Sequence, residues 1–512
     1  MVIPSQSNNK RIAKNTLFLY FRMILIMFVS LFTSRVVLEQ LGIQDFGIYN
    51  VVGGIVMMFA FINNSMASST QRYLTFELGK GNTNRLSEVF TTALNIHISI
   101  GIIVIVLAET IGLWFLNYKL NIPTERMYAA NWVYQFSILT FCINIIQVPY
   151  NACLIAHEKM SIYAYISILE AVLKLTIAYL ISITEFDRLI LYAILIFIVQ
   201  FAIRSIYQVY CKYKFAESRY RLFFDKNLFK QMSEFAGWNL FGSLAWLMRD
   251  QGLNIILNLF FGPIVNAARG IAVQVSSSVM GFISNFQVAM NPQIIKSYAT
   301  GNIKDMESLA FRGTKFSIIV LLFIAIPLCL NMDFILNIWL EEVPNYTSYF
   351  IILIMVDSLM STLFGTPFMT SLAATGKIKK YQITVSTIII MLIPISYIIF
   401  KLGFDAPAAL YIMIFITLSS GVVRFIFCKR QIGFSLKHML HDVILPLIKI
   451  IIPSLIIPIS LKLYYFQQHN LLNFIILCII SIICMVSATF LGGLDKNEKL
   501  ALINIIKSKI KK

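Results

Sequence analysis

The sequence has little charge, and most of the charge it has is positive. Lys, Arg, Asp and Glu make up 13% of the 512 residues, whereas soluble domains hold roughly 25%. Hydrophobic residues make up 58%, and the mean hydropathy is +0.78. No polar stretch is long enough to fold as a separate soluble domain. A chain of this composition can satisfy its apolar surface only in a lipid bilayer, which excludes the soluble globular class.

The sequence also lacks the short motifs of several kinds of site. Its seven cysteines lie in or beside apolar runs and form no C-x-x-C pair, so no disulfide framework is expected. Its five histidines are scattered without the spacing of a metal site. A phosphate-binding G-x-x-x-x-G-K-[ST] loop is absent, which excludes ATP hydrolysis of that type. We therefore expect no metal and no cofactor.

Apolar runs take up most of the chain. Each is long enough, at roughly 17–25 residues, to span a bilayer as a helix. The run IGIIVIVL (100–107) is apolar on every face, unlike the alternating strands of a membrane barrel. We predict an all-α polytopic membrane protein with about 14 transmembrane helices. The predicted segments are 15–38, 46–69, 89–116, 127–155, 161–183, 188–210, 232–258, 264–291, 313–335, 346–374, 379–401, 405–427, 442–465 and 470–491.

The positive charge is concentrated on one side of the predicted membrane. If both termini are cytoplasmic, the inner segments hold 30 of the 42 Lys and Arg residues, and the outer loops hold 5. This is the positive-inside pattern of membrane proteins. The net charge of +18 therefore indicates topology and contact with membrane lipids, not nucleic-acid binding.

The chain repeats itself after about 220 residues. A shift of 220 places Gly42 on Gly262 and also aligns two inner Gly-Asn pairs. We interpret LGIQDFGIYN (41–50) as a tight outer hairpin between the first two helices, and FFGPIVNAARG (260–270) as its counterpart. The other matches are Gly81-Asn82 with Gly301-Asn302 and, at a shift of 218, Pro149 with Pro367, Leu154 with Leu372, Ala156 with Ala374, Lys159 with Lys377 and Tyr163 with Tyr381.

The repeat predicts two lobes of six helices each, at 10–220 and 225–435. Two additional transmembrane helices follow at 440–492, and a basic cytoplasmic tail at 493–512. Because six is an even number, both lobes enter the membrane in the same orientation. Parallel repeats of this kind are a transporter architecture in which the substrate path lies between the halves.

Several ionisable groups and two prolines lie within the predicted helices. Arg22, Arg249 and Arg269 are candidates for binding a phosphate-bearing substrate, because the guanidinium fork matches phosphate oxygens. The alternative is that they pair with carboxylates and hold the helices together. Those carboxylates, which are also candidates for ion coupling, are Asp250, Asp357 and Glu109.

Pro149 and Pro367 lie in the inner halves of equivalent helices. A proline within a helix removes a hydrogen bond and kinks it. The two residues are therefore hinge candidates, and passive kinks are equally consistent with the sequence. Glu170 and Lys174, four residues apart, are expected to neutralise each other.

An ordered set of segments resembles the polysaccharide flippases (Wzx type) of the multidrug/oligosaccharidyl-lipid/polysaccharide exporter superfamily. The resemblance covers residues 10–435, and helices 13 and 14 are similar to the two extra helices that many members carry. The segments are LGIQDFGIYN, the Gly-Asn loop at 81–82, AHEKMSIYAYI (156–166), FAGWNLFGSLAWLMRDQGLNIILNLFFG (235–262) and NPQIIKSYATGN (291–302).

This resemblance implies a V-shaped bundle of two lobes in the bacterial inner membrane. It implies translocation of undecaprenyl-pyrophosphate-linked oligosaccharide repeat units from the inner to the outer leaflet by alternating access, in support of surface polysaccharide synthesis. Polysaccharide polymerase and assembly proteins are then expected partners. A multidrug antiporter of the same superfamily is the alternative. A membrane polymerase or ligase is disfavoured, because the outer loops reach only about a dozen residues.

Overall fold

The computed structural model describes residues 6–57, 60–118, 122–183, 186–340, 343–464, 470–496 and 498–500. Within these ranges the chain forms helices and no strand, which confirms the predicted all-α class. Most of the predicted basic tail, residues 501–512, lies outside the described residues.

The described helices include twelve that are long and apolar enough to cross a membrane. One of them, α8 (Lys226–Ala299), has 74 residues, and its length of about 110 Å at 1.5 Å per residue suffices for two crossings. The predicted span at 46–69 is not among the twelve. Residues 58 and 59 are not described, and α2, which follows them, contains the polar run Asn63–Ser65 near its start.

Contacts divide the chain into two compact units. Unit 1 comprises Met1–Leu244 with Ile295–Asn302, and unit 2 comprises Ala245–Ile294 with Ile303–Lys512. Helix α8 therefore begins and ends in unit 1, and its middle lies in unit 2. The predicted lobe boundaries at 220 and 225 stay predictions.

The other helices of unit 1 are α1 (Gln6–Met57), α2 (Ala60–Lys80), α3 (Thr83–Leu107), η1 (Ala108–Gly112), α4 (Leu113–Tyr118), η2 (Thr124–Arg126), α5 (Met127–Ala156), α6 (Met160–Leu180), α7 (Arg188–Lys214) and η3 (Ala216–Ser218). Those of unit 2 are α9 (Ile303–Leu330), α10 (Met332–Trp339), α11 (Thr347–Leu363), α12 (Thr366–Thr375), α13 (Lys379–Ile390), α14 (Leu392–Lys401), α15 (Pro407–Ile432), α16 (Leu436–Met439), η4 (Leu440–Ile444), α17 (Leu445–Tyr464), α18 (Leu471–Ala488) and η5 (Thr489–Gly493).

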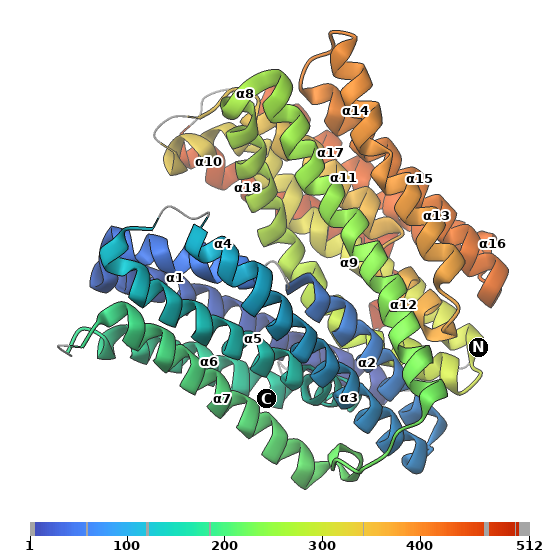
Figure 1. Ribbon diagram of the computed structural model, residues 1–512. Helices are drawn as coiled ribbons and strands as arrows, with labels where there is room; N and C mark the ends of the chain where they lie inside the picture. Colours follow the sequence, from blue (N-terminus) through green and yellow to red (C-terminus); the bar gives the residue numbers. More distant parts are fainter. Residues whose placement is uncertain are drawn as a thin grey trace, which may run out of the picture. The chain divides into compact units, whose positions relative to one another are not determined.

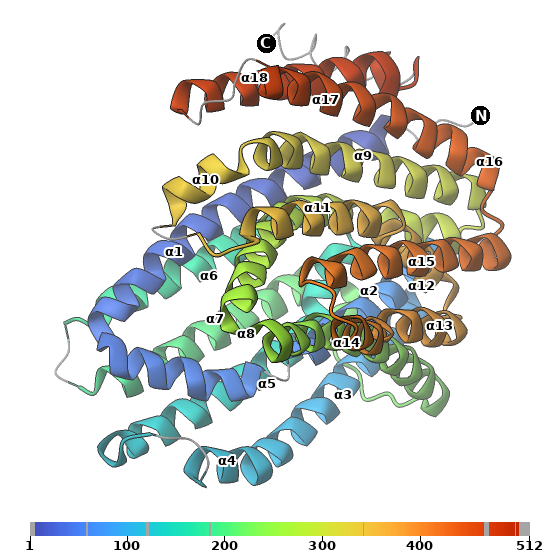
Figure 2. The same ribbon diagram turned by 90° about the horizontal axis from the view of Figure 1, so that it is seen from above.

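A single glycine interrupts each of the two longest helices. Gly42 has φ 76° and ψ 166° within α1, and Gly262 has φ 77° and ψ −172° within α8. This region of backbone space is essentially restricted to glycine. The ribbon of α8 reverses part-way along its length in Figure 1, and that of α1 turns in Figure 2. The predicted hairpin is therefore a one-residue break, with helix on both sides, and Gly47 stays helical.

Equivalent contacts recur in the two halves of the chain. In unit 1 the thiol of Cys211 donates to the carbonyl of Tyr150 over 3.7 Å. In unit 2 the thiol of Cys428 donates to the carbonyl of Phe368, also over 3.7 Å. Both pairs are related by the shift of about 218 residues that aligns the sequences. The repeat therefore extends from sequence to packing between the fourth and sixth helices of each half.

The two additional helices belong to unit 2. Helices α17 and α18 pack against each other and against α9 (Figure 2). Both are strongly apolar, with mean hydropathies of 2.3 and 2.8 for their spans. They therefore widen the lipid-facing side of unit 2.

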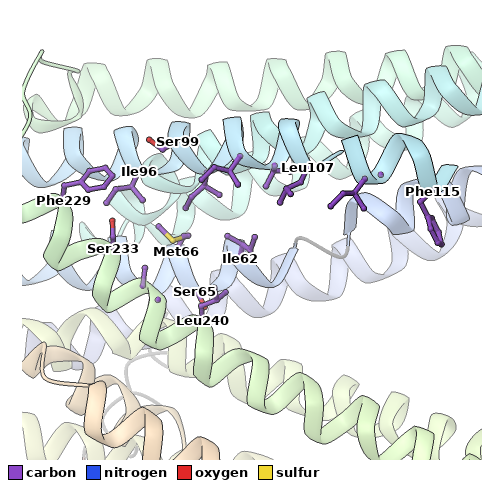
Figure 3. Close-up of a pocket in the computed structure, with 17 residues that line it drawn as sticks. Ile62, Ser65, Met66, Ile96, Ser99, Leu107, Phe115, Phe229, Ser233 and Leu240 are labelled. Atoms are coloured by element: carbon purple, nitrogen blue, oxygen red, sulfur yellow. The ribbon is translucent and has the colours of Figure 1, made fainter. Parts of the chain in front are cut away.

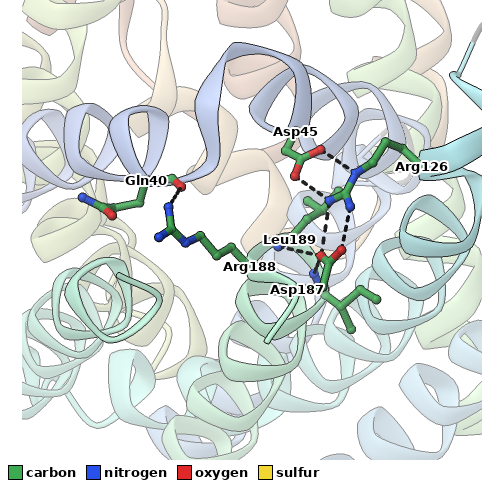
Figure 4. Close-up of polar contacts among 7 residues, drawn as sticks. Gln40, Asp45, Arg126, Asp187, Arg188 and Leu189 are labelled. Carbon is green, nitrogen blue, oxygen red and sulfur yellow. Dashed lines mark hydrogen bonds and ion pairs between the residues drawn. The ribbon is translucent and has the colours of Figure 1, made fainter. Parts of the chain in front are cut away.

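An ion network ties three helices of unit 1 together (Figure 4). Arg126, at the start of α5, donates to Asp45 of α1 over 2.8 and 2.5 Å, and to Asp187 over 2.6 Å. Asp187 also caps α7 by accepting from the N–H groups of Leu189 and Ile190, each over 3.1 Å. The aspartate of LGIQDFGIYN thus anchors the turn of α1 to the starts of α5 and α7.

Replacing Gly262 with Ala is expected to destabilise the protein by about 1–3 kcal/mol, because a Cβ strains this backbone conformation. The matched control is Gly270→Ala, at a helical position with nothing within 4 Å of the added Cβ. Thermal unfolding of the detergent-purified proteins checks this. Equal loss of stability in both variants would contradict a special role for the φ of Gly262.

The charge of Asp187 is expected to stabilise unit 1 only above about pH 4. Burial tends to raise the pKa of Asp187, but the hydrogen bonds from Arg126 and the Ile190 N–H outweigh it, so the pKa lies below its usual value. A carboxylate with a lowered pKa stabilises the fold above its unfolded pKa of about 3.9, and this contribution is lost as the pH falls further.

Asp187→Asn keeps a capping side chain and removes the charge. Its melting temperature is therefore expected to lie below that of the parent protein at pH 7, and the difference is expected to shrink below pH 4. Asp442→Asn, at an exposed carboxylate, is the control. A difference that is independent of pH would contradict this account.

Candidate functional site

A buried ion pair lies at the centre of unit 2. Arg249 of α8 donates through Nη2 to Oδ2 of Asp357 on α11 over 2.5 Å. Thr417 of α15 donates to the other carboxylate oxygen, also over 2.5 Å. The side chains of Arg249 and Asp357 are only 4% and 10% exposed. Three helices of unit 2 therefore meet at one carboxylate.

The guanidinium of Arg249 is held on a second side by an aromatic ring. It lies 4.6 Å from the centroid of Trp246, one turn earlier on α8, in cation–π geometry. Its Nε has no hydrogen-bond partner among the described residues. Arg249 is thus held by Asp357 and Trp246, while its Nε–H makes no hydrogen bond within the described part of the chain.

Arg269 lies in the same cluster but is paired differently. Its side chain is 2% exposed, donates to Asn254 and lies 3.6 Å from Asp250, whose side chain is 55% exposed. Asn254 and Asp250 are one turn apart on α8, whereas Arg269 follows the break at Gly262. The reversal at this glycine folds α8 back and brings Arg269 against the preceding part of the same helix.

The sequence left open that the arginines pair with carboxylates, and two of the three candidate carboxylates do lie beside an arginine. Asp357 pairs with Arg249, and Asp250 lies beside Arg269. The third, Glu109, is in unit 1 on η1 and accepts from Gln135 over 3.2 Å. Whether any of them couples an ion stays a prediction.

The remaining arginine candidate, Arg22, lies in unit 1. Its Nη2 is 3.5 Å from the hydroxyl of Tyr163, and its guanidinium lies 4.6 Å from the centroid of that ring. Arg22 is partly buried.

The charged cluster is not repeated in unit 1. The positions that correspond to Arg249 and Arg269 at a shift of 220 are Val29 and Tyr49. The position that corresponds to Asp357 at a shift of 218 is Leu139. The two halves therefore share helices and turns but differ in their membrane-embedded charges.

The two hinge candidates lie in different local structures. Pro149 is inside the continuous helix α5. Pro367 occupies the first turn of α12, after a break at Phe364 and Gly365. The predicted span at 346–374 is confirmed as Thr347–Thr375, but its helix is interrupted, and Pro367 lies in the first turn of a new helix, where its missing N–H is not needed. Hinge roles for the two prolines stay predictions.

Two buried arginines have contacts that the sequence alone does not indicate, because both lie in stretches whose charge is explained equally well by the positive-inside pattern. Arg424 of α15 donates to the carbonyl of Phe364 over 2.5 Å, and so satisfies the backbone at the helix break. Arg72 of α2 is 7% exposed and lies 4.5 and 4.8 Å from the ring centroids of Tyr73 and Phe76. The aromatic residues that follow Arg72 in the sequence could have indicated these cation–π contacts.

Unit 1 contains a large apolar cavity of about 920 Å³ (Figure 3). It lies between α2, α3 and the first part of α8, and the polar side chains among its described lining residues are Ser65, Ser99 and Ser233. Arg72 is seven residues beyond Ser65 on α2, a rise of about 10 Å. The cavity can therefore hold a hydrocarbon chain or a flat apolar molecule, and its described lining residues include no charged side chain.

Breaking the Arg249–Asp357 pair is expected to cost about 3–5 kcal/mol, because removing one partner leaves a buried charge uncompensated. Arg249→Ala and Asp357→Ala should each lose this much, and the double variant should lose less than their sum. The half-exposed pair of Arg85 and Glu88 is the control, for which about 0–1 kcal/mol is expected. Thermal or denaturant unfolding in detergent measures the energies, and additive losses would show that the pair is not coupled.

Comparisons with known proteins agree with this architecture. Residues 19–180 match the MatE family model. No curated protein sequence matches the chain. A multidrug resistance MATE family transporter of the MOP superfamily, in an outward-facing conformation, is similar at a TM-score of 0.71 and 12% identity, covering 83% of this chain and 96% of that one.

Two further structures have the same fold. MATE in the bent conformation has a TM-score of 0.72 and 12% identity, with 83% of this chain and 96% of that one covered. A MOP superfamily transporter from Pyrococcus furiosus, described as having a binding pocket of reverse polarity, has a TM-score of 0.66, 12% identity and the same coverage. The chain is therefore a multi-pass membrane protein that contains a MatE segment at residues 19–180 and has the fold of the MOP superfamily transporters.

Proposed function

We propose that this protein is a flippase that moves undecaprenyl-pyrophosphate-linked oligosaccharide repeat units from the inner to the outer leaflet of the bacterial inner membrane by alternating access. The observation that carries the proposal is the pair of buried arginines in unit 2. Ionisable side chains at membrane depth are costly and mark substrate or ion paths. Guanidinium groups suit a pyrophosphate in particular, because they bind its oxygens bidentately.

Of the two arginines, Arg269 is the better pyrophosphate ligand. Arg249 already has a close carboxylate partner in Asp357 and an aromatic ring beneath it. The nearest carboxylate to Arg269 belongs to the exposed Asp250, at 3.6 Å. A pyrophosphate can replace this weak contact at little cost, whereas displacing Asp357 would leave a second buried charge without a partner. Arg249 then holds the helices around the site.

The carboxylates divide in the same way. Asp250 is 55% exposed and is released when a substrate takes over Arg269, so it is the better candidate for ion coupling. Asp357 accepts hydrogen bonds from both Arg249 and Thr417, and so has a structural role in the same cluster. The apolar cavity of unit 1 supports the proposal separately, since its hydrocarbon lining suits the undecaprenyl chain.

A cation-coupled multidrug antiporter is the second candidate. The cavity of about 920 Å³ favours it, because an apolar pocket with three serines also fits a hydrophobic drug. One structural neighbour is described as a multidrug resistance MATE family transporter. Arg249 and Arg269 would repel a cationic drug, and for this reason we prefer the flippase to the antiporter.

A strain that lacks this protein is expected to accumulate complete lipid-linked oligosaccharides on the cytoplasmic leaflet and to lose surface polysaccharide. Arg269→Ala should restore export about 10- to 100-fold less well than the parent gene, because one charged hydrogen-bond partner contributes about 1.5–3 kcal/mol. Leaflet-specific labelling of extracted oligosaccharides measures this.

The control is Arg221→Ala, an exposed arginine on the segment before α8. It should restore full export, and membrane levels of both variants should match the parent. Normal polysaccharide in the deletion strain, together with increased drug sensitivity, would favour the antiporter instead. If the Arg269→Ala variant restored full export, Arg269 could not be the ligand of the pyrophosphate.

A further inference from the structure

A cluster of three metal-binding side chains lies in unit 1, and none of the three lines the cavity. Cys153 is in the last turn of α5, His157 caps that helix, and Glu217 lies on η3, after α7. Nε2 of His157 is 2.5 Å from Oε1 of Glu217, and the same oxygen is 4.0 Å from Sγ of Cys153. All three donor atoms lie within 4.8 Å of one another.

The backbone directs these side chains toward one point. Cys153 and His157 are four residues apart, which places them on one face of the helix end. The ring of His157 stacks on Phe215 at 4.0 Å with an interplanar angle of 13°, which fixes the direction of its Nε2. Phe215 directly precedes η3, so the contact that orients the histidine also positions Glu217.

The donor set is typical of zinc. A thiolate, an imidazole nitrogen and a carboxylate oxygen bind zinc at about 2.3, 2.0 and 2.1 Å. Donors around such an ion are thus separated by about 3–4 Å, so the thiol already lies at a suitable separation from the carboxylate. The His157–Glu217 contact must open by about 1 Å to admit the ion. Cys211, whose thiol donates to the Tyr150 carbonyl, interacts electrostatically with Cys153 and supplies a further sulfur nearby.

The burial of the cluster favours an ion over a purely electrostatic pair. Cys153 is 1% exposed, and the side chains of His157 and Glu217 are 23% and 10% exposed. A simple ion pair of His157 with Glu217 does not explain why the Cys153 thiol lies at the same carboxylate oxygen of Glu217. The pair His438–Glu307 in unit 2 offers the comparison, since it is a histidine–glutamate contact, 3.3 Å long, in which His438 is 60% exposed.

We propose that Cys153, His157 and Glu217 bind a zinc ion on the predicted cytoplasmic side of unit 1. Binding replaces the proton of the Cys153 thiol, which is released to solvent, and the neutral imidazole binds through Nε2. The ion then joins the end of α5 to η3, and thereby secures the segment that leads from α7 to α8. A water molecule completes the four ligands.

The test uses the full-length protein, purified in detergent with a thiol reductant, and zinc or cobalt(II) chloride as the only probe. After equilibration with zinc and removal of the excess, elemental analysis is expected to find one zinc per chain. Cobalt(II) is expected to give a sulfur-to-metal charge-transfer band. Cys153→Ser should abolish the band, and His157→Gln and Glu217→Gln should each lose the stoichiometric zinc.

His438→Gln is the matched control and should keep the zinc and the cobalt band. If Cys153→Ser fails to fold, the cobalt spectrum of the parent protein still decides whether a thiolate binds the metal. Absence of zinc, absence of the charge-transfer band, or retention of both by the Cys153→Ser protein would overturn the proposal and leave His157 and Glu217 as an ion pair.

Discussion

The structure depends above all on the need of the backbone to form its hydrogen bonds without water. In the hydrocarbon region each unpaired N–H or C=O group costs several kcal/mol, so the chain remains helical wherever it can. Its breaks are therefore short and compensated. Gly42 and Gly262 each reverse a helix with a single residue, and the break at Phe364 has its carbonyl bonded by the buried Arg424. The break at Gly262 also brings Arg269 against Asp250 and Asn254.

The same constraint acts on the side chains at membrane depth. Arg249 is compensated by Asp357, and Arg269 by Asn254 and, more weakly, by Asp250. A charge that is fully compensated stabilises the fold, whereas one that is partly compensated can exchange its partner for a ligand. The cluster of unit 2 contains one arginine of each kind. This difference underlies the assignment of a structural role to Arg249 and a binding role to Arg269.

The two halves of the chain show how a repeat can keep its fold and change its chemistry. Gly42 and Gly262 have nearly the same backbone angles, and the contacts of Cys211 and Cys428 are equivalent. Yet unit 1 holds an apolar cavity and unit 2 a charged cluster.

The sequence by itself determined the all-α membrane class, most of the spans, the repeat and the i,i+4 pair of Glu170 and Lys174, found at 2.7 Å. These follow from local composition and spacing, because hydropathy and helical periodicity act over short stretches of chain. Only the tertiary structure decided which arginine meets which carboxylate, because Arg249 and Asp357 are 108 residues apart. It also decided the burial of Arg72, the interruption of the helix before Pro367 and the meeting of Cys153 with Glu217. Each of these depends on how distant helices pack, and no local pattern of residues specifies that packing.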